Sequence, residues 1–197
     1  MKRLAIFCDG TWNRLDSPHP TNVVLGTEAV LQRASDDTLQ ITHYHEGVGT
    51  SHLVSRRLSA FVAGAFGLGL FDKVADAYRF IVLNYEVGDE IYIFGFSRGA
   101  FTARSLAGLI RNCGILSRNH IEKVPRALAF YRGRTPDMHP DSENAMRFRR
   151  RHSPCTIINE EERNWRKQEN PGSEDNEHEI FQIKYLGVWD TVGALVD

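Results

Sequence analysis

The sequence has few cysteines and lacks a long run of apolar residues. Its three cysteines, Cys8, Cys113 and Cys155, are far apart and include no CxxC pair. This spacing argues against a disulfide framework or a zinc site and favours a reducing compartment. The longest uncharged apolar run extends over residues 58–71, which is shorter than the roughly 18 residues expected of a membrane span. We therefore predict a soluble protein without a metal ion.

An excess of charge of one sign is also absent. The 197 residues include 24 Lys and Arg and 25 Asp and Glu, which gives a formal net charge of -1. This balance provides no global attraction to nucleic acid or to an anionic membrane, so we expect no nucleic-acid partner and only transient contact with a membrane surface. The first apolar run ends at Asp9 and is too short for a signal peptide. It predicts a cytoplasmic protein, unless a contact-dependent secretion system exports it.

Apolar runs alternate with helical patterns along the chain, which is typical of an α/β fold with a mainly parallel sheet flanked by helices. Residues 117–179 differ, because they contain clustered charges, several prolines and few apolar runs. We interpret them as a polar insertion of helices and loops, or a lid, within a single α/β-hydrolase-like domain. The predicted strands are residues 4–8, 40–44, 90–94 and 180–189, and the predicted helices are residues 23–33, 71–85 and 98–112.

Three of the predicted strands are followed by short polar or glycine-rich clusters. These clusters are residues 9–11, 95–99 and 190–193. In open α/β sheets, sites form at the carboxyl ends of the strands. We therefore expect the three clusters to meet at one edge of the sheet.

The middle cluster has the pattern G-x-S-x-G, with Ser97 between Gly95 and Gly99. A predicted strand precedes it and a predicted helix follows it, which is the setting of a nucleophile elbow. The glycines would let the strand and the helix pack closely around a strained serine, and the backbone N–H of Arg98 would stabilise an oxyanion. The alternative is a structural turn in which Ser97 only caps the helix.

A serine nucleophile needs a base and an acid that orients the base. Asp190 follows the next strand after the elbow, where α/β-hydrolases place the acid; the alternative is that Asp190 caps a turn. The histidine normally comes after the acid, but all eight histidines precede Asp190. His45, at a strand end, is a candidate base or a structural residue. We therefore expect this chain to be a C-terminally incomplete domain whose histidine lies elsewhere.

The first cluster, Asp9-Gly10-Thr11, permits two interpretations. Phosphatases of the haloacid dehalogenase type have a related motif, but their nucleophile position is Phe7 here, which disfavours that chemistry. In a serine hydrolase, the backbone N–H of Gly10 or Thr11 would be the second oxyanion donor. Further candidate pocket residues are Asp9, His45, Trp12 and Asn13.

Four segments together resemble a known family: "FCDGTWN", "EGVGT", "GDEIYIFGFSRGAFTAR" and "GVWDTVGA". The family is the uncharacterised α/β-hydrolase family that includes the catalytic domains of type VI secretion phospholipase effectors. The resemblance extends from Leu4 to Ala194, interrupted by residues 117–179. It implies that Ser97 is the nucleophile and Asp190 the acid, and that the substrate is a carboxylic ester, such as a lipid or phospholipid. It implies no cofactor.

Two functional hypotheses follow from these patterns. The first is a serine hydrolase that cleaves carboxylic esters. The second is a catalytically incomplete, hydrolase-like binding module, which the missing histidine favours.

Four arginines surround Phe148 in residues 147–151 and form a basic cluster with two interpretations. It could bind phosphate groups. We favour a solvated helix face that residues 160–162, all glutamates, balance in charge.

Overall fold

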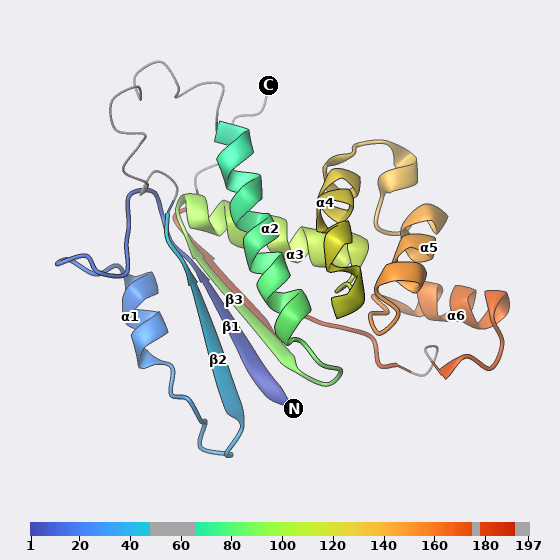
Figure 1. Cartoon of the computed structure of the whole chain (residues 1–197), viewed down its shortest axis with the longest axis horizontal. Coiled ribbons are helices and arrows are strands. Elements are labelled where there is room, and N and C mark those ends of the chain that lie inside the picture. Colours follow the sequence, from blue (N-terminus) through green and yellow to red (C-terminus); the bar gives the residue numbers. More distant parts are fainter. Residues whose placement is uncertain (48–65, 175–177, 192–197) are drawn as a thin grey trace. The chain divides into compact units, whose positions relative to one another are not determined.

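The computed structural model (Figure 1) describes residues 1–47, 66–174 and 178–191. Parts of two motifs used above, residues 48–50 and 192–194, lie outside the described residues. The chain divides into two compact units. The sheet unit comprises Met1–Ala77, Gly88–Leu106 and Ile183–Asp197, and the helical unit comprises Tyr78–Val87 and Ala107–Gln182.

The sheet unit contains four parallel strands in the order β2-β1-β3-β4, so the predicted α/β fold with a mainly parallel sheet is confirmed. The register places Cys8 opposite both His45 and Gly95, and Phe96 opposite Trp189. The carboxyl ends of all four strands therefore lie along one edge. The strands are β1 (Lys2–Cys8), β2 (Leu39–His45), β3 (Glu90–Phe96) and β4 (Tyr185–Trp189).

Helices cover both faces of the sheet because β1 buries side chains on both sides. Ala5 and Phe7 pack with Val23 of α1 (Asn22–Ala29). On the other face, Cys8 lines a pocket together with side chains from α2 (Phe66–Asn84) and α3 (Arg98–Cys113). A continuous apolar run is what a strand buried on both faces requires.

Two predicted elements are shorter than expected. The first helix ends at Ala29 rather than residue 33, because Arg33 forms an antiparallel bridge with Leu39 and the chain has already turned back. The last strand begins at Tyr185 rather than residue 180, because Ile180 forms a bridge with Ile157. In both cases a backbone pairing that the local pattern cannot reveal sets the boundary.

The helical unit includes residues 117–179, and none of the described residues in this range forms a strand. Among all the described residues, no helix is both long and apolar enough to cross a membrane. The role of residues 117–179 as an insertion or lid stays a prediction. Its elements after α3 are two 3₁₀ helices, η1 (Arg118–Lys123) and η2 (Pro136–Met138), and the α-helices α4 (Val124–Arg132), α5 (Glu143–His152) and α6 (Glu160–Glu169).

A buried charged triad joins α5 to α6. Glu162 accepts from Arg149 Nε at 2.9 Å and from Arg166 Nη2 at 2.6 Å, and all three side chains are 0% exposed. The prediction that the basic cluster forms a solvated helix face is therefore wrong at Arg149. Its partner Glu162 is also buried, so the pair lies in the interior rather than in solvent. A buried charge is tolerated only when it is paired and its remaining polar atoms are bonded.

Backbone carbonyls supply most of those remaining bonds, although Arg149 Nη2 is buried without a hydrogen-bond partner among the described residues. Arg149 Nη1 donates to the carbonyls of Asn112 (2.8 Å) and Pro140 (2.9 Å). Arg166 donates to the carbonyls of Pro154 (2.7 Å) and Thr156 (2.8 Å). The triad thus ties the segments before α5 and α6 to the helices themselves.

We predict that Glu162→Gln lowers the free energy of unfolding by about 3–5 kcal/mol, because it leaves two buried guanidinium groups without a counter-charge. Urea unfolding followed by far-UV circular dichroism measures the change. Glu161→Gln is the matched control, since Glu161 is exposed on the same helix, and we expect it to alter stability by no more than about 0.5 kcal/mol. Equal stabilities of the two variants would contradict the importance of the triad.

Candidate active site

Ser97 lies directly after β3 in a backbone conformation that serine rarely adopts. Its φ is +54°, its N–H donates to the carbonyl of Trp189 (3.1 Å), and its own carbonyl accepts from Ala100 N (3.1 Å). A positive φ brings Cβ close to the backbone and costs free energy for any residue other than glycine. The sharp change from strand to helix is thus held by bonds on both sides of Ser97.

The two glycines around Ser97 are required by close packing. A Cβ added at Gly95 would lie 2.5 Å from the carbonyl oxygen of Gly99 and 2.8 Å from the Cβ of Ala103. A Cβ added at Gly99 would collide with the carbonyl oxygen of Cys8. Helix α3 therefore begins in direct backbone contact with β1 and β3, as expected for a G-x-S-x-G turn.

Asp190 occupies the corresponding position after the neighbouring strand. Phe96 and Trp189 are register partners and end β3 and β4. Ser97 and Asp190 are therefore the first residues after two adjacent strands. Asp190 also has a positive φ of +50°, and so does Trp12, in the turn after β1, at +64°. Strained backbone of this kind clusters at functional sites. The structure thus brings Ser97 and Asp190 to one edge, with the Asp190 side chain exposed.

Asp9 is buried at the end of β1 and accepts four hydrogen bonds. Its Oδ1 accepts from Gly10 N (2.7 Å) and Asn13 Nδ2 (3.1 Å), and its Oδ2 accepts from Thr21 Oγ1 (2.6 Å) and Tyr44 OH (2.8 Å). Burial, and after it the Asp9 carboxylate, raises the pKa of Tyr44. Asp9 therefore fixes the turn after β1, the start of α1 and the end of β2.

This network includes two residues that the site prediction did not contain. Thr21 is the N-cap of α1, since its hydroxyl also accepts from Val24 N, and a threonine just before a predicted helix is the signal that could have marked it. Nothing in the local pattern around Tyr44 marks it as a partner of a residue 35 positions away. Only the parallel pairing of β1 with β2 brings it to Asp9.

The turn at Gly10 and Thr11 lies beside Ser97. A Cβ added at Gly10 would be 3.2 Å from the Cβ of Ser97. The Gly10 N–H already donates to Asp9 Oδ1, so it is engaged within its own turn. The Thr11 N–H has no acceptor, and Thr11 Oγ1 is buried without a partner, among the described residues. Of the two predicted oxyanion donors, Thr11 is thus the one whose backbone N–H is available to a ligand.

Trp12 and Asn13 occupy the outer part of the same turn. The Trp12 side chain is 53% exposed. Asn13 accepts from Gly47 N (3.1 Å) through its carbonyl while its side chain bonds Asp9. Asn13 therefore braces the turn, and Trp12 is presented to solvent.

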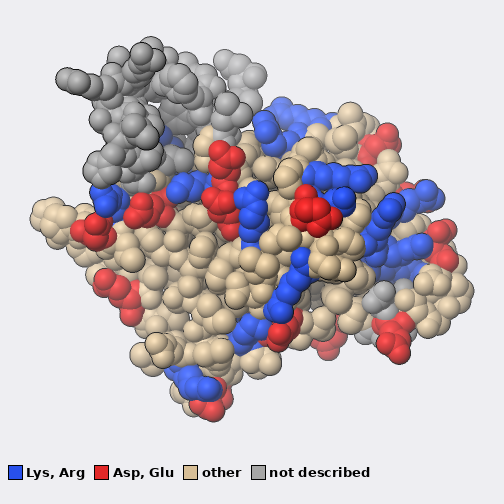
Figure 2. Space-filling model, viewed as in Figure 1, with Lys and Arg blue, Asp and Glu red and all other residues tan. Residues whose placement is uncertain are grey.

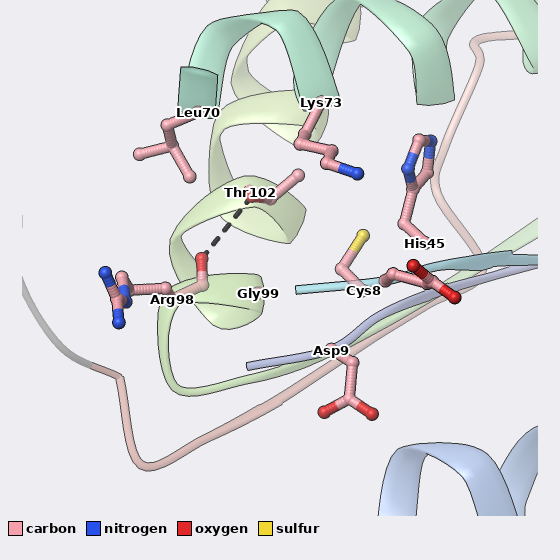
Figure 3. Close-up of a pocket in the computed structure, with 9 residues that line it drawn as sticks. Cys8, Asp9, His45, Leu70, Lys73, Arg98, Gly99 and Thr102 are labelled. Atoms are coloured by element: carbon pink, nitrogen blue, oxygen red, sulfur yellow. Dashed lines mark hydrogen bonds between the residues drawn. The ribbon is translucent and has the colours of Figure 1, made fainter. Parts of the chain in front are cut away.

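His45 lines a small pocket on the opposite side of β1 from the Asp9 carboxylate. Figure 3 shows Cys8, Lys73 and His45 on the side of α2 and α3, and the Asp9 carboxylate pointing the other way. The pocket encloses about 10 Å³, close to the space that one water molecule needs. Thr102, which also lines it, donates to the carbonyl of Arg98 at 3.4 Å.

The histidine and the cysteine in this pocket are both uncharged near neutral pH. Burial, with His43 and Lys73 nearby, lowers the pKa of His45 to about 4. Burial raises the pKa of the Cys8 thiol to about 12, so Cys8 is unsuited to act as a thiolate nucleophile. Ser97 does not line this pocket, and its Oγ forms no hydrogen bond with any histidine in the described part of the chain. His45 and Ser97 are thus not brought together.

Comparison with known proteins finds a family model and a relative that match this chain. The family model described as "T6SS, Phospholipase effector Tle1-like, catalytic domain" matches residues 2–196. An uncharacterized protein of Saccharomyces cerevisiae, YEL023C, is 34% identical over 150 residues, which cover 71% of this chain. The match spans 22% of the yeast protein's own length. No solved structure matches the chain.

We predict that Asp9→Asn lowers the free energy of unfolding by about 2–3 kcal/mol, because an amide replaces a carboxylate that receives four donors. The measurement is urea unfolding at neutral pH. Asp16→Asn is the control, since the Asp16 side chain is 71% exposed and its partner is Arg14, which is also exposed. Its effect should be within about 0.5 kcal/mol. A stable Asp9→Asn protein would show that the turn does not depend on this charge.

We predict that Gly99→Ala destabilises the protein by about 3 kcal/mol, because the added methyl group meets backbone rather than a movable side chain. Gly69→Ala provides the comparison: Gly69 is in α2, and no atom of the described residues lies within 4 Å of an added Cβ. There alanine should stabilise the helix by about 0.5–1 kcal/mol. Opposite signs in thermal or urea unfolding are the expected result, and a loss at both positions would argue against the steric explanation.

Proposed function

The chain belongs to the family of type VI secretion, Tle1-like phospholipase effector catalytic domains, and on that premise we propose that it is a lipid hydrolase in which Ser97 is the nucleophile. The observation that carries the proposal is the strained backbone of Ser97, with a φ of +54°, between two glycines that admit no side chain. Strain that the surrounding packing maintains is a feature of functional positions. A serine that merely capped a helix would adopt extended backbone instead.

The proposed reaction is hydrolysis of a carboxylic ester. Ser97 Oγ attacks the carbonyl carbon while a base removes its proton, and the resulting tetrahedral intermediate expels the alcohol, which takes up that proton. Water then attacks the acyl-enzyme through the same base. The carboxylic acid leaves and the serine hydroxyl is restored. No metal or organic cofactor takes part in this scheme.

Backbone amides would stabilise the oxyanion. The first amide of α3 belongs to Arg98, directly after the nucleophile, which is where such enzymes place one donor. We assign the second donor to Thr11 rather than Gly10, because the Gly10 N–H donates to Asp9. In this proposal Gly10 lacks a side chain so that the turn can approach Ser97 closely, and Asp9 positions the turn.

Asp190 is proposed as the acid that orients the base. Its place after β4, next to Ser97 across the register, supports that role. The base is proposed to be a histidine. His45 has a neutral ring but lies in a separate pocket, and His52 lies outside the described residues.

The second candidate function is a hydrolase-like binding module that does not turn over substrate. One observation favours it: Ser97 Oγ forms no hydrogen bond with any base in the described ranges. In that case the elbow would retain its packing without an activated serine.

We predict that the protein reacts with a fluorophosphonate probe and that Ser97→Ala abolishes the reaction, because only an activated serine is phosphonylated. Ser105→Ala, in the same helix α3, should leave labelling unchanged. Asp190→Asn should slow labelling by at least about 100-fold if Asp190 orients the base. Absence of labelling in the unaltered protein would sink the hydrolase proposal and favour the binding module.

Product analysis with phosphatidylglycerol vesicles then tests the substrate. Ester hydrolysis by Ser97 should release fatty acid and a lysophospholipid. Release of the phosphorylated head group instead would rule out the proposed carboxylic ester. Labelling of His45→Ala at the normal rate would exclude His45 as the base.

A further inference from the structure

A groove in the helical unit lies between one face of α4 and one face of α5. It has a volume of about 400 Å³ and is open to solvent. Residues of α5 spaced by three or four positions share a face, and those lining the groove follow this spacing. The lining residues that carry the argument are Arg126 and Phe130 of α4 and Arg147, Phe148, Arg151 and His152 of α5.

The floor of the groove is aromatic. Phe130 and Phe148 stack with their ring centroids 5.5 Å apart and their planes at 23°. The His152 ring contacts Phe148 at 4.9 Å, and the guanidinium of Arg126 lies 6.0 Å from the centre of the Phe148 ring. The groove therefore combines an apolar surface with cationic side chains directly beside it.

The rim of the groove is positively charged. Arg126 and Arg151 form no ion pair with any residue in the described ranges. Arg147 pairs with Glu143 at 2.6 Å, but both side chains are about 60% exposed, so solvent weakens that pair. Asp137 is the acidic residue among those that line the groove.

The sequence concentrates positive charge in this part of the chain. Residues 118–152 contain nine Lys and Arg against four Asp and Glu, a net charge of +5 in a chain whose total is -1. Figure 2 shows Lys and Arg side chains gathered over α4 and α5. The local field acts on His152, whose pKa is lowered by burial and further by His120, Arg126 and Arg151.

We propose that this groove binds the phosphate-bearing head group of an anionic phospholipid and thereby holds the protein on a lipid surface. Arg126, Arg147 and Arg151 would contact the phosphate, since guanidinium groups match the geometry of phosphate oxygens. Phe130 and Phe148 would contact the glycerol and the first acyl carbons. Cationic side chains beside aromatic ones suit the boundary between head groups and acyl chains.

A lipid head group fits the groove better than a nucleic acid does. The cavity accommodates one compact group, and the charge is local. Outside residues 118–152 the chain has a net charge of -6, whereas proteins that bind long polyanions carry a basic stripe on a basic domain. A membrane presents its anionic groups in a plane, so one basic patch suffices.

The proposal does not depend on the hydrolase reaction, because binding can be measured without turnover. The experiment uses the full chain with Ser97→Ala and measures co-sedimentation with vesicles of phosphatidylcholine, with or without phosphatidylglycerol. We expect binding only to vesicles that contain phosphatidylglycerol, and we expect salt to weaken it. Failure of fluorophosphonate labelling in the unaltered protein would leave this result unaffected.

Three variants test whether the groove is responsible. Arg126→Gln with Arg151→Gln should weaken binding about 30-fold, the loss expected for two basic residues near an anionic surface. Arg118→Gln with Arg150→Gln removes the same charge from exposed residues that pair with Glu86 and Glu169 outside the groove, and should have a much smaller effect. Asn144→Glu adds a negative charge to the groove in the first turn of α5, where the helix tolerates it, and should also weaken binding.

Three results would overturn the proposal. Equal loss in the two double variants would mean that binding follows net charge rather than the groove. Binding of inorganic phosphate by the groove without binding of anionic vesicles would assign the site to a soluble phosphate ligand. Binding of duplex DNA without binding of anionic vesicles would assign the basic face to nucleic acid. Far-UV circular dichroism of each variant verifies that the helices are intact.

Discussion

The close contact of α3 with the sheet is the constraint on which the rest of the candidate active site depends. At Gly95 and Gly99 the backbones of strand and helix approach so closely that a methyl group would collide. The chain can pass from β3 to α3 without a longer loop only because Ser97 accepts a positive φ. The same contact fixes the first amide of the helix beside Ser97. Packing thus determines where the Arg98 amide, the proposed oxyanion donor, lies relative to Ser97.

A single buried carboxylate organises the neighbouring turn. Asp9 is 3% exposed, and four donors surround its two oxygens. Those donors come from the turn itself, from Thr21 before α1 and from Tyr44 in β2. One charge therefore couples three segments at the carboxyl edge of the sheet. This coupling gives Asp9, an acidic residue close to Ser97, a structural role.

The sequence revealed features that local composition controls and missed those that depend on distant partners. The apolar run of β1 and the glycines around Ser97 are visible in the sequence itself, so the parallel sheet and the tight turn at residues 95–99 could be predicted. The partnership of Asp9 with Tyr44 could not, because it requires the register of β1 and β2. The burial of Arg149 was hidden for a related reason. A run of arginines looks solvated until α6 supplies Glu162 and backbone carbonyls to satisfy one member of it.

That buried arginine also determines which of its neighbours can meet a ligand. Arg149 is held in the interior by Glu162, and this contact fixes the rotation of α5 about its axis. Residues three or four positions apart share a helix face, so Arg147 and Arg151 are directed together toward the groove that Phe148 floors. Arg150 is directed elsewhere, over the ring of Trp165. One cluster in the sequence thereby becomes three environments: a buried structural ion pair, a solvated surface pair and the basic rim of a groove.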